Sequence, residues 1–187
     1  MNKLPILISV PHAGLTIPSE VESLNLLTME QIIADGDEGT KEIYAIEELV
    51  DKFVTTDIAR AFVDANRKEN DFSVDGVVKT HTCWNIPVYK SPLSPTVIKQ
   101  LLDRYYFPYH AQLTNSVGKD ITLAIDCHTM ASSGPPVGPD PGLVRPMVCL
   151  SNADGTCPEE WFHLLADCLY ETFGSKVSIN KPFGGGH

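Results

Sequence analysis

Basic side chains are scarce in this 187-residue sequence, which contains 14 lysines and arginines against 24 aspartates and glutamates and carries a formal net charge of -10. This balance argues against a nucleic-acid backbone or an anionic membrane as the main partner, because both attract proteins through clusters of basic side chains. An anionic small molecule would therefore need a local group of arginines.

The sequence also lacks the marks of a secreted or membrane protein. Its five cysteines are odd in number, widely spaced and without a C-x-x-C pair, which favours reduced thiols over a disulfide framework. It shows no signal-peptide pattern at its start and no apolar run of membrane-spanning length. We therefore expect a cytoplasmic protein that acts on a small molecule and binds neither nucleic acid nor a membrane.

What is present is the composition of an ordinary globular domain. With 43% hydrophobic residues over 187 positions, the chain can bury a sizeable core. No repeat, low-complexity tract or linker divides it, which predicts one domain over residues 1–187. Strand-like and helix-like segments alternate along it, which favours a layered α/β fold with a mixed sheet.

Local patterns predict the elements of this fold. Thr28 followed by Gln31 has the form of a helix N-cap and its capping-box partner, and the Gly- and Asp-rich residues 35–39 end that helix. Strands are expected at residues 4–10, within 54–64, and at 121–125, 144–150 and 176–180. Helices are expected at residues 40–53, from Ser94 through Leu113 with a kink near Pro108, and at 158–173, where Trp161, Leu164, Leu165, Cys168 and Leu169 share an apolar face.

Two of the expected strands run directly into a histidine: residues 4–10 lead to His12, and the apolar, buried-looking residues 121–125 lead to His128. Because α/β sheets place their sites at the carboxyl ends of strands, these imidazoles and a carboxylate from the acidic loop at Asp37 and Glu38 form a candidate hydrolytic zinc site. Taken alone, each histidine favours a structural role, as a turn residue or a hydrogen-bonded core residue; taken as a pair at strand ends, the two fit a structural role and a metal site equally.

Asp126 and Cys127 stand directly before the second histidine. Asp126 shares a strand face with His128, so it is a candidate for orienting that imidazole or, alternatively, for capping the loop. Cys127 points to the opposite face, which argues against a Cys–His dyad and favours a core position.

Arg60, Asn66 and Arg67 are candidates for binding an anionic ligand. A guanidinium fork beside an amide suits a substrate carboxylate, whereas an ion pair with a neighbouring acid such as Asp64 is the alternative. The glycines at residues 184–186, with Gly185 at their centre, either let the backbone approach a ligand closely or form a flexible end.

A series of short motifs, taken in order along the chain, resembles the N-formylglutamate amidohydrolase family. The motifs are S-V-P-H-A-G at residues 9–14, D-E-G-T at 37–40, V-D-A-N-R at 63–67, Y-H-A-Q-L at 109–113, D-C-H-T-M at 126–130 and N-K-P-F-G-G-G at 180–186. Each motif alone is unspecific, but their order over nearly the whole chain makes the resemblance specific.

The resemblance implies a three-layer α/β/α fold with a mixed sheet, of the zinc-carboxypeptidase-like (phosphorylase/hydrolase-like) type. It also implies a metal-dependent amidohydrolase that splits N-formyl-L-glutamate into formate and glutamate, a step of histidine catabolism. Matched residue by residue, His12, Asp37 and His128 would bind Zn2+ or another divalent transition metal, with Glu38 as the alternate to Asp37.

The resemblance further implies the remaining parts of the site. Asn66 and Arg67 match the pair that holds a substrate carboxylate, Arg60 and Gly185 would add further substrate contacts, and Asp126 would stand behind a metal-binding histidine. Relatives carry their general-base glutamate late in the chain, so we expect that residue, and the C-terminal part of the domain, beyond residue 187.

Two other functions fit the same residues. A catalytically incomplete domain would bind the metal and the ligand without hydrolysing it. A related zinc amidase or peptidase would act on another N-acyl amino acid or on a γ-glutamyl substrate. Metal content and formate release distinguish the first alternative from an active amidohydrolase. A substrate panel distinguishes the second.

Overall fold

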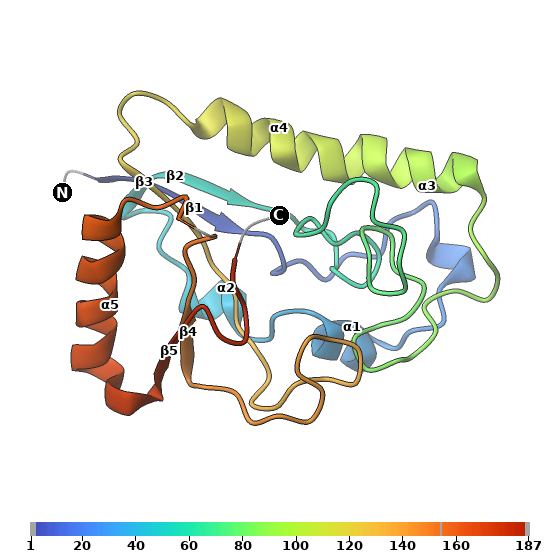
Figure 1. The fold of residues 1–187 in the computed structure, drawn as a ribbon. Coiled ribbons are helices and arrows are strands. Elements are labelled where there is room, and N and C mark those ends of the chain that lie inside the picture. Colours follow the sequence, from blue (N-terminus) through green and yellow to red (C-terminus); the bar gives the residue numbers. More distant parts are fainter. Residues whose placement is uncertain (1–2, 154, 186–187) are drawn as a thin grey trace. The chain divides into compact units, whose positions relative to one another are not determined.

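The structure is a computed structural model that describes residues 3–153 and 155–185 (Figure 1). The chain divides after Met130 into two compact units, the second beginning at Ala131. Both strands that lead to histidines belong to the first unit, so the fold around the candidate site is the fold of that unit. One domain over residues 1–187 stays a prediction.

A three-stranded sheet forms the centre of the first unit. β1 (Leu4–Val10) lies between β2 (Val50–Thr55) and β3 (Leu123–Asp126) and pairs with both in parallel. The strands predicted at residues 4–10 and 121–125 are thus confirmed, the second with a small shift. The mixed sheet is wrong for the named strands of the described residues, because each connection returns the chain to the same end of the sheet.

The helix α1 (Met29–Asp35) begins as predicted. The Thr28 hydroxyl accepts a hydrogen bond from the Gln31 main-chain N–H, and the Gln31 side chain accepts one from the Thr28 N–H. This confirms the capping box and its place in the sequence. The helix ends before Gly36, and a short 3-10 turn, η1 (Glu22–Leu24), precedes it.

The predicted helix over residues 40–53 is wrong. Only α2 (Thr40–Ile43) is helical, and β2 follows it instead. The apolar spacing in this segment fits a helix but also fits a strand with Val50 and Val54 buried, and pairing with β1 decides between them. The strand expected within residues 54–64 is confirmed only where it overlaps the end of β2.

One long helical run follows, as expected. It consists of α3 (Pro95–Leu101), the π-helical segment η2 (Leu102–Tyr106) and α4 (Phe107–Ser116), which Figure 1 shows as one helical rod. Ser94 caps its first turn. The irregularity predicted near Pro108 is the π-helical segment just before it, since proline has no N–H to donate to the regular ladder.

The two faces of the sheet carry different apolar clusters. Leu7 of β1 packs with Tyr109 of α4 on one face, and Ile8 packs with Tyr44, which follows α2, on the other. Figure 1 accordingly shows α4 and α2 on opposite sides of the strands. The first unit therefore has helix, sheet and helix in three layers. The strand β3 lies at the sheet edge and is half exposed, so the expectation of a buried strand there is wrong.

The largest apolar cluster of the first unit lies beside this sheet, around the fully buried Phe62 and Leu101. It includes Val77 from residues 68–82, a segment of polar and turn-rich composition in which Lys79 is also buried. This cluster fixes the chain that follows β2, from which Asp64 and its neighbours approach the sheet.

The second unit contains β4 (Val148–Leu150), α5 (Glu159–Phe173), the 3-10 turn η3 (Gly174–Lys176) and β5 (Val177–Ile179). The two strands pair in parallel. The predicted helix is confirmed, but its inner face is wrong in part: Ala166 is buried, whereas Trp161, Leu164 and Cys168 are exposed. Within residues 3–153 and 155–185, none of the helices combines the length and the apolar character that crossing a membrane requires.

Candidate metal centre

His12, Asp37 and His128 lie together at the carboxyl edge of the three-stranded sheet. His12 follows β1 and His128 follows β3, and parallel pairing brings the ends of these strands side by side. Asp37 comes from the loop between α1 and α2. One possible ligand atom from each of the three residues lies within 4.8 Å of the others, so the group could hold a metal ion.

A glycine allows the turn at His12 to pack closely against the chain after β2. Gly14 forms a bridge to Ala59, and a Cβ atom on Gly14 would lie 2.3 Å from the carbonyl carbon of Asp57. Any residue with a Cβ atom would clash with this carbonyl group, so only glycine fits here. Glycine at this position therefore sets the path of residues 11–14 and with it the place of His12.

A single carboxylate oxygen of Asp37 faces both imidazoles. Its Oδ2 lies 3.3 Å from His12 Nδ1 and 2.8 Å from His128 Nδ1, and the two ring centroids are 4.8 Å apart. Burial raises the pKa of Asp37, but the charges and hydrogen bonds of the two imidazoles lower it more, so this pKa lies well below its usual range. Asp37 is thus a carboxylate, the form that binds metals.

On its outer side, His12 meets a second carboxylate. Its Nε2 lies 2.8 Å from Oδ1 of Asp64, a wholly buried residue that also accepts hydrogen bonds of 2.9 Å from Arg60 Nε and from the main-chain N–H of Asn66. Burial raises the pKa of Asp64, but Arg60, His12 and Lys79 hold it well below its usual range. An ionised Asp64 fixes the ring orientation of His12.

His128 has a corresponding partner in Asp126. Its Nε2 lies 2.9 Å from Asp126 Oδ2. The side-chain amide nitrogen of Asn66 lies 3.2 Å from His128 Nε2. The other Asp126 oxygen accepts a 2.7 Å hydrogen bond from the Ser9 hydroxyl, which is 2.6 Å from the Tyr109 hydroxyl. Burial lowers the pKa of His128, but its contacts with Asp126 and Asp37 raise it to about 10.

These contacts place both histidines between acceptors. A neutral imidazole has one N–H donor and one acceptor nitrogen, yet in each ring Nδ1 faces Asp37 while Nε2 faces Asp64 or Asp126. A proton on Nε2 of each ring satisfies the outer carboxylate. Without a metal ion, His128 also carries a proton on Nδ1, because its pKa is about 10, and a bound ion would take the place of that proton between the two Nδ1 atoms and the Asp37 oxygen. This donor set fits a divalent metal ion held by two imidazoles and a carboxylate.

The structure also places the two residues that flank this group in sequence. In the described part of the chain, the group of possible metal ligands includes Asp37 and not Glu38, whose carbonyl accepts a hydrogen bond from the Thr129 hydroxyl. Cys127 packs on the opposite side of the strand among apolar residues, and burial with the nearby Asp126 charge raises its pKa to about 12. The thiol is thus a core residue, as predicted.

Carboxylates hold both arginines that were predicted to bind the substrate. Arg60 donates from Nε to Asp64 and from Nη1 to the Asp35 carbonyl, 3.1 Å away. Arg67 donates from Nε to the Asp75 carbonyl and from Nη2 to the Asp75 carboxylate, each over 2.9 Å. Arg60 is the more enclosed of the two, and the guanidinium of Arg67 stays partly exposed.

Gly185 belongs to the second unit. Its φ of 74° lies in the left-handed region that favours glycine, and a Cβ atom there would be 3.0 Å from the Ser151 side chain and 3.1 Å from the Ala153 nitrogen. Glycine is therefore required for a tight turn in that unit. Its contact with a substrate stays a prediction.

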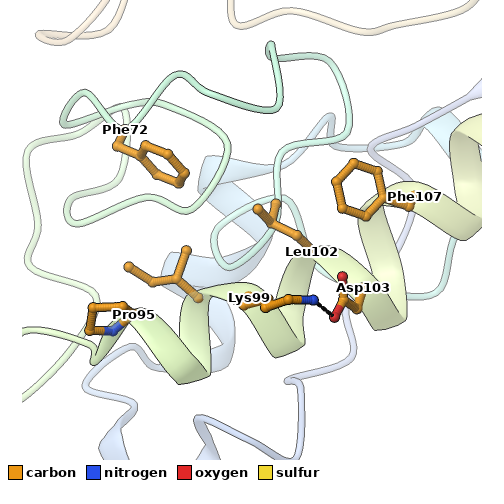
Figure 2. Close-up of a pocket in the computed structure, with 7 residues that line it drawn as sticks. Phe72, Pro95, Lys99, Leu102, Asp103 and Phe107 are labelled. Atoms are coloured by element: carbon orange, nitrogen blue, oxygen red, sulfur yellow. Dashed lines mark hydrogen bonds and ion pairs between the residues drawn. The ribbon is translucent and has the colours of Figure 1, made fainter.

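The first unit also has an apolar groove, shown in Figure 2, with a volume of about 470 Å³. It is lined by Phe72, Pro95, Ile98, Lys99, Leu102, Asp103 and Phe107. None of these residues belongs to the histidine–aspartate group, and the two charged residues, Lys99 and Asp103, form an ion pair with each other. The groove therefore has no converging polar groups of the kind that the candidate metal centre shows.

Sequence reasoning missed several residues that build this centre. Asp64 entered only as an ion-pair partner of a neighbouring arginine, and Ser9, Lys79 and Tyr109 were not singled out. Ser9, Asp64 and Tyr109 lie inside motifs that pointed to the family, which is the one signal that the sequence offered. The contacts themselves join residues far apart in the chain, so no local pattern reveals them.

Comparisons with known proteins agree with the resemblance seen in the motifs. The family model of the N-formylglutamate amidohydrolases matches residues 4–187. An N-formylglutamate deformylase of Pseudomonas putida is 26% identical to this chain over 200 residues, covering 100% of the chain and 73% of that relative.

Two solved structures share the fold. The crystal structure of an N-formylglutamate amidohydrolase from Ralstonia eutropha JMP134 has a TM-score of 0.80 at 21% identity and covers 100% of this chain and 75% of its own. That of the gene product Atu2144 from Agrobacterium tumefaciens has a TM-score of 0.73 at 17% identity and covers 96% of this chain and 69% of its own. Since the family model spans nearly every residue, this chain belongs to the N-formylglutamate amidohydrolase family.

Proposed function

We propose that this chain hydrolyses the formyl amide of N-formyl-L-glutamate, or of a similar N-acyl amino acid, to release formate and the free amino acid. In this proposal His12, Asp37 and His128 hold a divalent metal ion. The observation that carries it is the convergence of two Nδ1 atoms and one carboxylate oxygen, each imidazole being backed by its own outer carboxylate. Family membership supports the reaction, and the deformylase name of the 26% identical relative supports the formyl group.

Zn2+ is the ion that we propose, because two imidazoles and one carboxylate with an open position form a known ligand set of hydrolytic zinc sites. When bound, such an ion acidifies a water molecule and polarises an amide carbonyl. The protein contributes the orientation of the ligands: Asp64 and Asp126 keep protons on the outer nitrogens, so the inner nitrogens stay available.

Arg67 is our main candidate for the substrate carboxylate. A guanidinium has five N–H donors, and the bonds to Asp75 and to the Asn66 carbonyl use one on each nitrogen, which leaves donors for a ligand. The neighbouring amide of Asn66 reaches His128, so the Asn–Arg pair lies beside the metal ligands. We propose that Arg60 assists indirectly, because its guanidinium is enclosed against Asp64.

We also propose that the fold is zinc-carboxypeptidase-like. Support comes from the parallel sheet with helices on both faces and from histidines that follow neighbouring parallel strands. Superposition of an experimental structure of this protein on carboxypeptidases tests this: the metal ligands should coincide after the sheets are aligned. A different strand order around the ligands would remove the assignment.

The function is tested by metal analysis together with formate release. The purified protein should contain about one equivalent of zinc, lose activity on chelation and regain it with Zn2+. It should release formate from N-formyl-L-glutamate faster than from N-formyl-L-leucine, and faster than it releases glutamate from a γ-glutamyl peptide. Zinc binding without turnover of any of these amides would contradict the enzyme proposal and favour a metal-binding domain. Faster turnover of the γ-glutamyl peptide would reassign the substrate.

Substitution of the ligands gives the matched control. His12→Ala and His128→Ala should each lower zinc affinity by more than about tenfold and abolish formate release. His163→Ala removes an imidazole from the exposed surface of α5 and should change neither. Unchanged zinc affinity in His128→Ala would show that the ligand set is wrong.

A further inference from the structure

Lys79 is a buried cation outside the group of possible metal ligands. Its ammonium has no exposed surface and lies 3.1 Å from Asp35 Oδ2, 2.6 Å from Asp75 Oδ1 and 3.8 Å from Asp64 Oδ2. Burying an ammonium is unfavourable unless its charge is balanced, so Lys79 can be buried here because these carboxylates surround it. One side chain thus joins three acids that come from separate parts of the chain.

Each of these acids has a second partner. Asp35 ends α1 and accepts a 2.6 Å hydrogen bond from the Cys83 main-chain N–H, which ties the ammonium to the backbone. Asp64 contacts His12, and Asp75 contacts Arg67. The ammonium therefore lies between the histidine proposed to bind the metal and the arginine proposed to bind the substrate.

The contact between Asp75 and Arg67 fixes the direction of the guanidinium. Nε donates to the Asp75 carbonyl and Nη2 to the Asp75 carboxylate oxygen Oδ2. The other oxygen, Oδ1, is buried and accepts no hydrogen bond within the described residues, so the ion pair with Lys79 balances it. Without the ammonium, this carboxylate would have to turn toward Arg67 or toward water.

The whole cluster is balanced in charge, so the loss of Lys79 would disturb all of its members. Three carboxylates, Asp35, Asp64 and Asp75, face three cations, Lys79 and the two arginines. Asp64 Oδ2 lies 2.9 Å from Arg60 Nε and 4.0 Å from Arg67 Nε. Removing one cation would leave a surplus carboxylate that competes for both guanidinium groups.

We propose that Lys79 is a positioning residue that holds Asp64 against His12 and Asp75 against Arg67, so that metal binding and substrate binding depend on one buried ammonium. This inference rests on the proposed function for its substrate arm. Its metal arm requires only that the histidine–aspartate group binds a divalent ion.

Lys79→Met, which keeps the apolar length of the side chain, tests both arms. Relative to the unaltered protein, affinity for Co2+, followed by its visible absorption, should fall about tenfold, and KM for N-formyl-L-glutamate should rise about tenfold. Nitrogen NMR of the imidazoles should show that His12 loses its fixed Nε2-protonated form. A purely structural lysine would lower the thermal midpoint and leave metal affinity, KM and the tautomer unchanged, which would overturn the proposal.

Asp75→Asn keeps the inference testable if Lys79→Met does not fold, because Asp75 lies near the surface and its amide can still accept from Arg67. It should raise KM several-fold and leave Co2+ affinity unchanged, whereas an unchanged KM would refute the substrate arm. Lys99→Met is the matched control for Lys79→Met: it removes an exposed ammonium that pairs with Asp103, and it should change neither Co2+ affinity nor KM. If the unaltered protein releases no formate, the proposed function fails, and Co2+ binding by Lys79→Met still decides the metal arm.

Discussion

The two histidines of the candidate metal centre face the same Asp37 oxygen from different surroundings. The His12 side chain is 3% exposed, and its outer partner Asp64 is wholly buried among cations. The His128 side chain is 30% exposed, and its partner Asp126 is 42% exposed on an edge strand. The His12–Asp64 pair thus lies inside a buried charge cluster, whereas the similar His128–Asp126 pair lies at the edge of the sheet.

The two imidazole orientations are enforced in different ways. Around His12 every partner is ionised and buried, so a change there leaves an uncompensated charge. Around His128 the support comes from the buried hydroxyls of Ser9 and Tyr109, but His128 and Asp126 are themselves partly exposed, so solvent can replace a partner that either of these two loses. Substitutions on the His12 side should therefore cost more stability than matched substitutions on the His128 side.

The largest effect is expected from Asp64→Asn. Removing this charge leaves Arg60 without its carboxylate partner and Lys79 with one counter-ion fewer, which should lower the free energy of unfolding by about 3–5 kcal/mol and weaken zinc binding. Urea denaturation and zinc titration measure the two effects. Asp51→Asn, at an exposed position of β2, is the control and should be neutral. A loss below about 1 kcal/mol would show that the cluster does not depend on Asp64.

Gly14→Ala should come next, again on the His12 side. The added Cβ would meet the Asp57 carbonyl at 2.3 Å, and such overpacking typically costs about 1–3 kcal/mol and should displace the turn that carries His12. Thermal unfolding and zinc affinity should both decline. Gly118→Ala, where a Cβ would meet nothing within 4 Å, is the matched control. Equal melting temperatures for the two variants would contradict the close packing of this turn.

Asp126→Asn is the equivalent change on the His128 side. We expect a 10–100-fold loss of zinc affinity, because a neutral amide accepts the hydrogen bond from His128 Nε2 more weakly than a carboxylate and orients the ring less firmly. Stability should fall little, because Asp126 is partly exposed. Comparing its unfolding curve with that of Asp64→Asn tests the contrast directly. Equal destabilisation by the two substitutions would remove the distinction between the two sides.

The smallest effect is expected from Tyr109→Phe. It removes one hydrogen bond to Ser9 while Ser9 still donates to Asp126, so stability should fall by about 0.5–1.5 kcal/mol and zinc affinity by a few-fold at most. Ser9→Ala removes both bonds and should weaken zinc binding more than Tyr109→Phe does. The reverse order would mean that the tyrosine acts through its ring packing and not through the hydroxyl chain.

The elements that could be predicted from the sequence are those with strong local signals. The capping box at Thr28, the apolar strand at residues 4–10 and the amphipathic helix at residues 158–173 each carry their own pattern, and the structure has all three. The strand β2 was missed because its apolar spacing also suits a helix, and only pairing with a distant strand decides.

The candidate site divides in the same way. His12 and His128 could be found because each follows an expected strand. The acidic loop offered Asp37 and Glu38, and the family motifs favoured Asp37. Lys79 could not be found, since it sits in a segment whose composition is polar and whose burial depends on the packing of the large apolar cluster. Residues that contact a ligand leave a local pattern more often than the residues that hold them in place.

If the proposed ion binds, the loop that carries Asp37 would link metal supply to folding. Asp37 is separated from His12 by 25 residues and from His128 by 91, so an ion held by all three closes two long loops that are open in the unfolded chain. By mass action, free ion at 100 times its dissociation constant would add about 2.7 kcal/mol to the stability of the native state. The amount of folded protein in a cell would then follow the available metal, and a shortage of the ion would be felt as degradation before it is felt as slow catalysis.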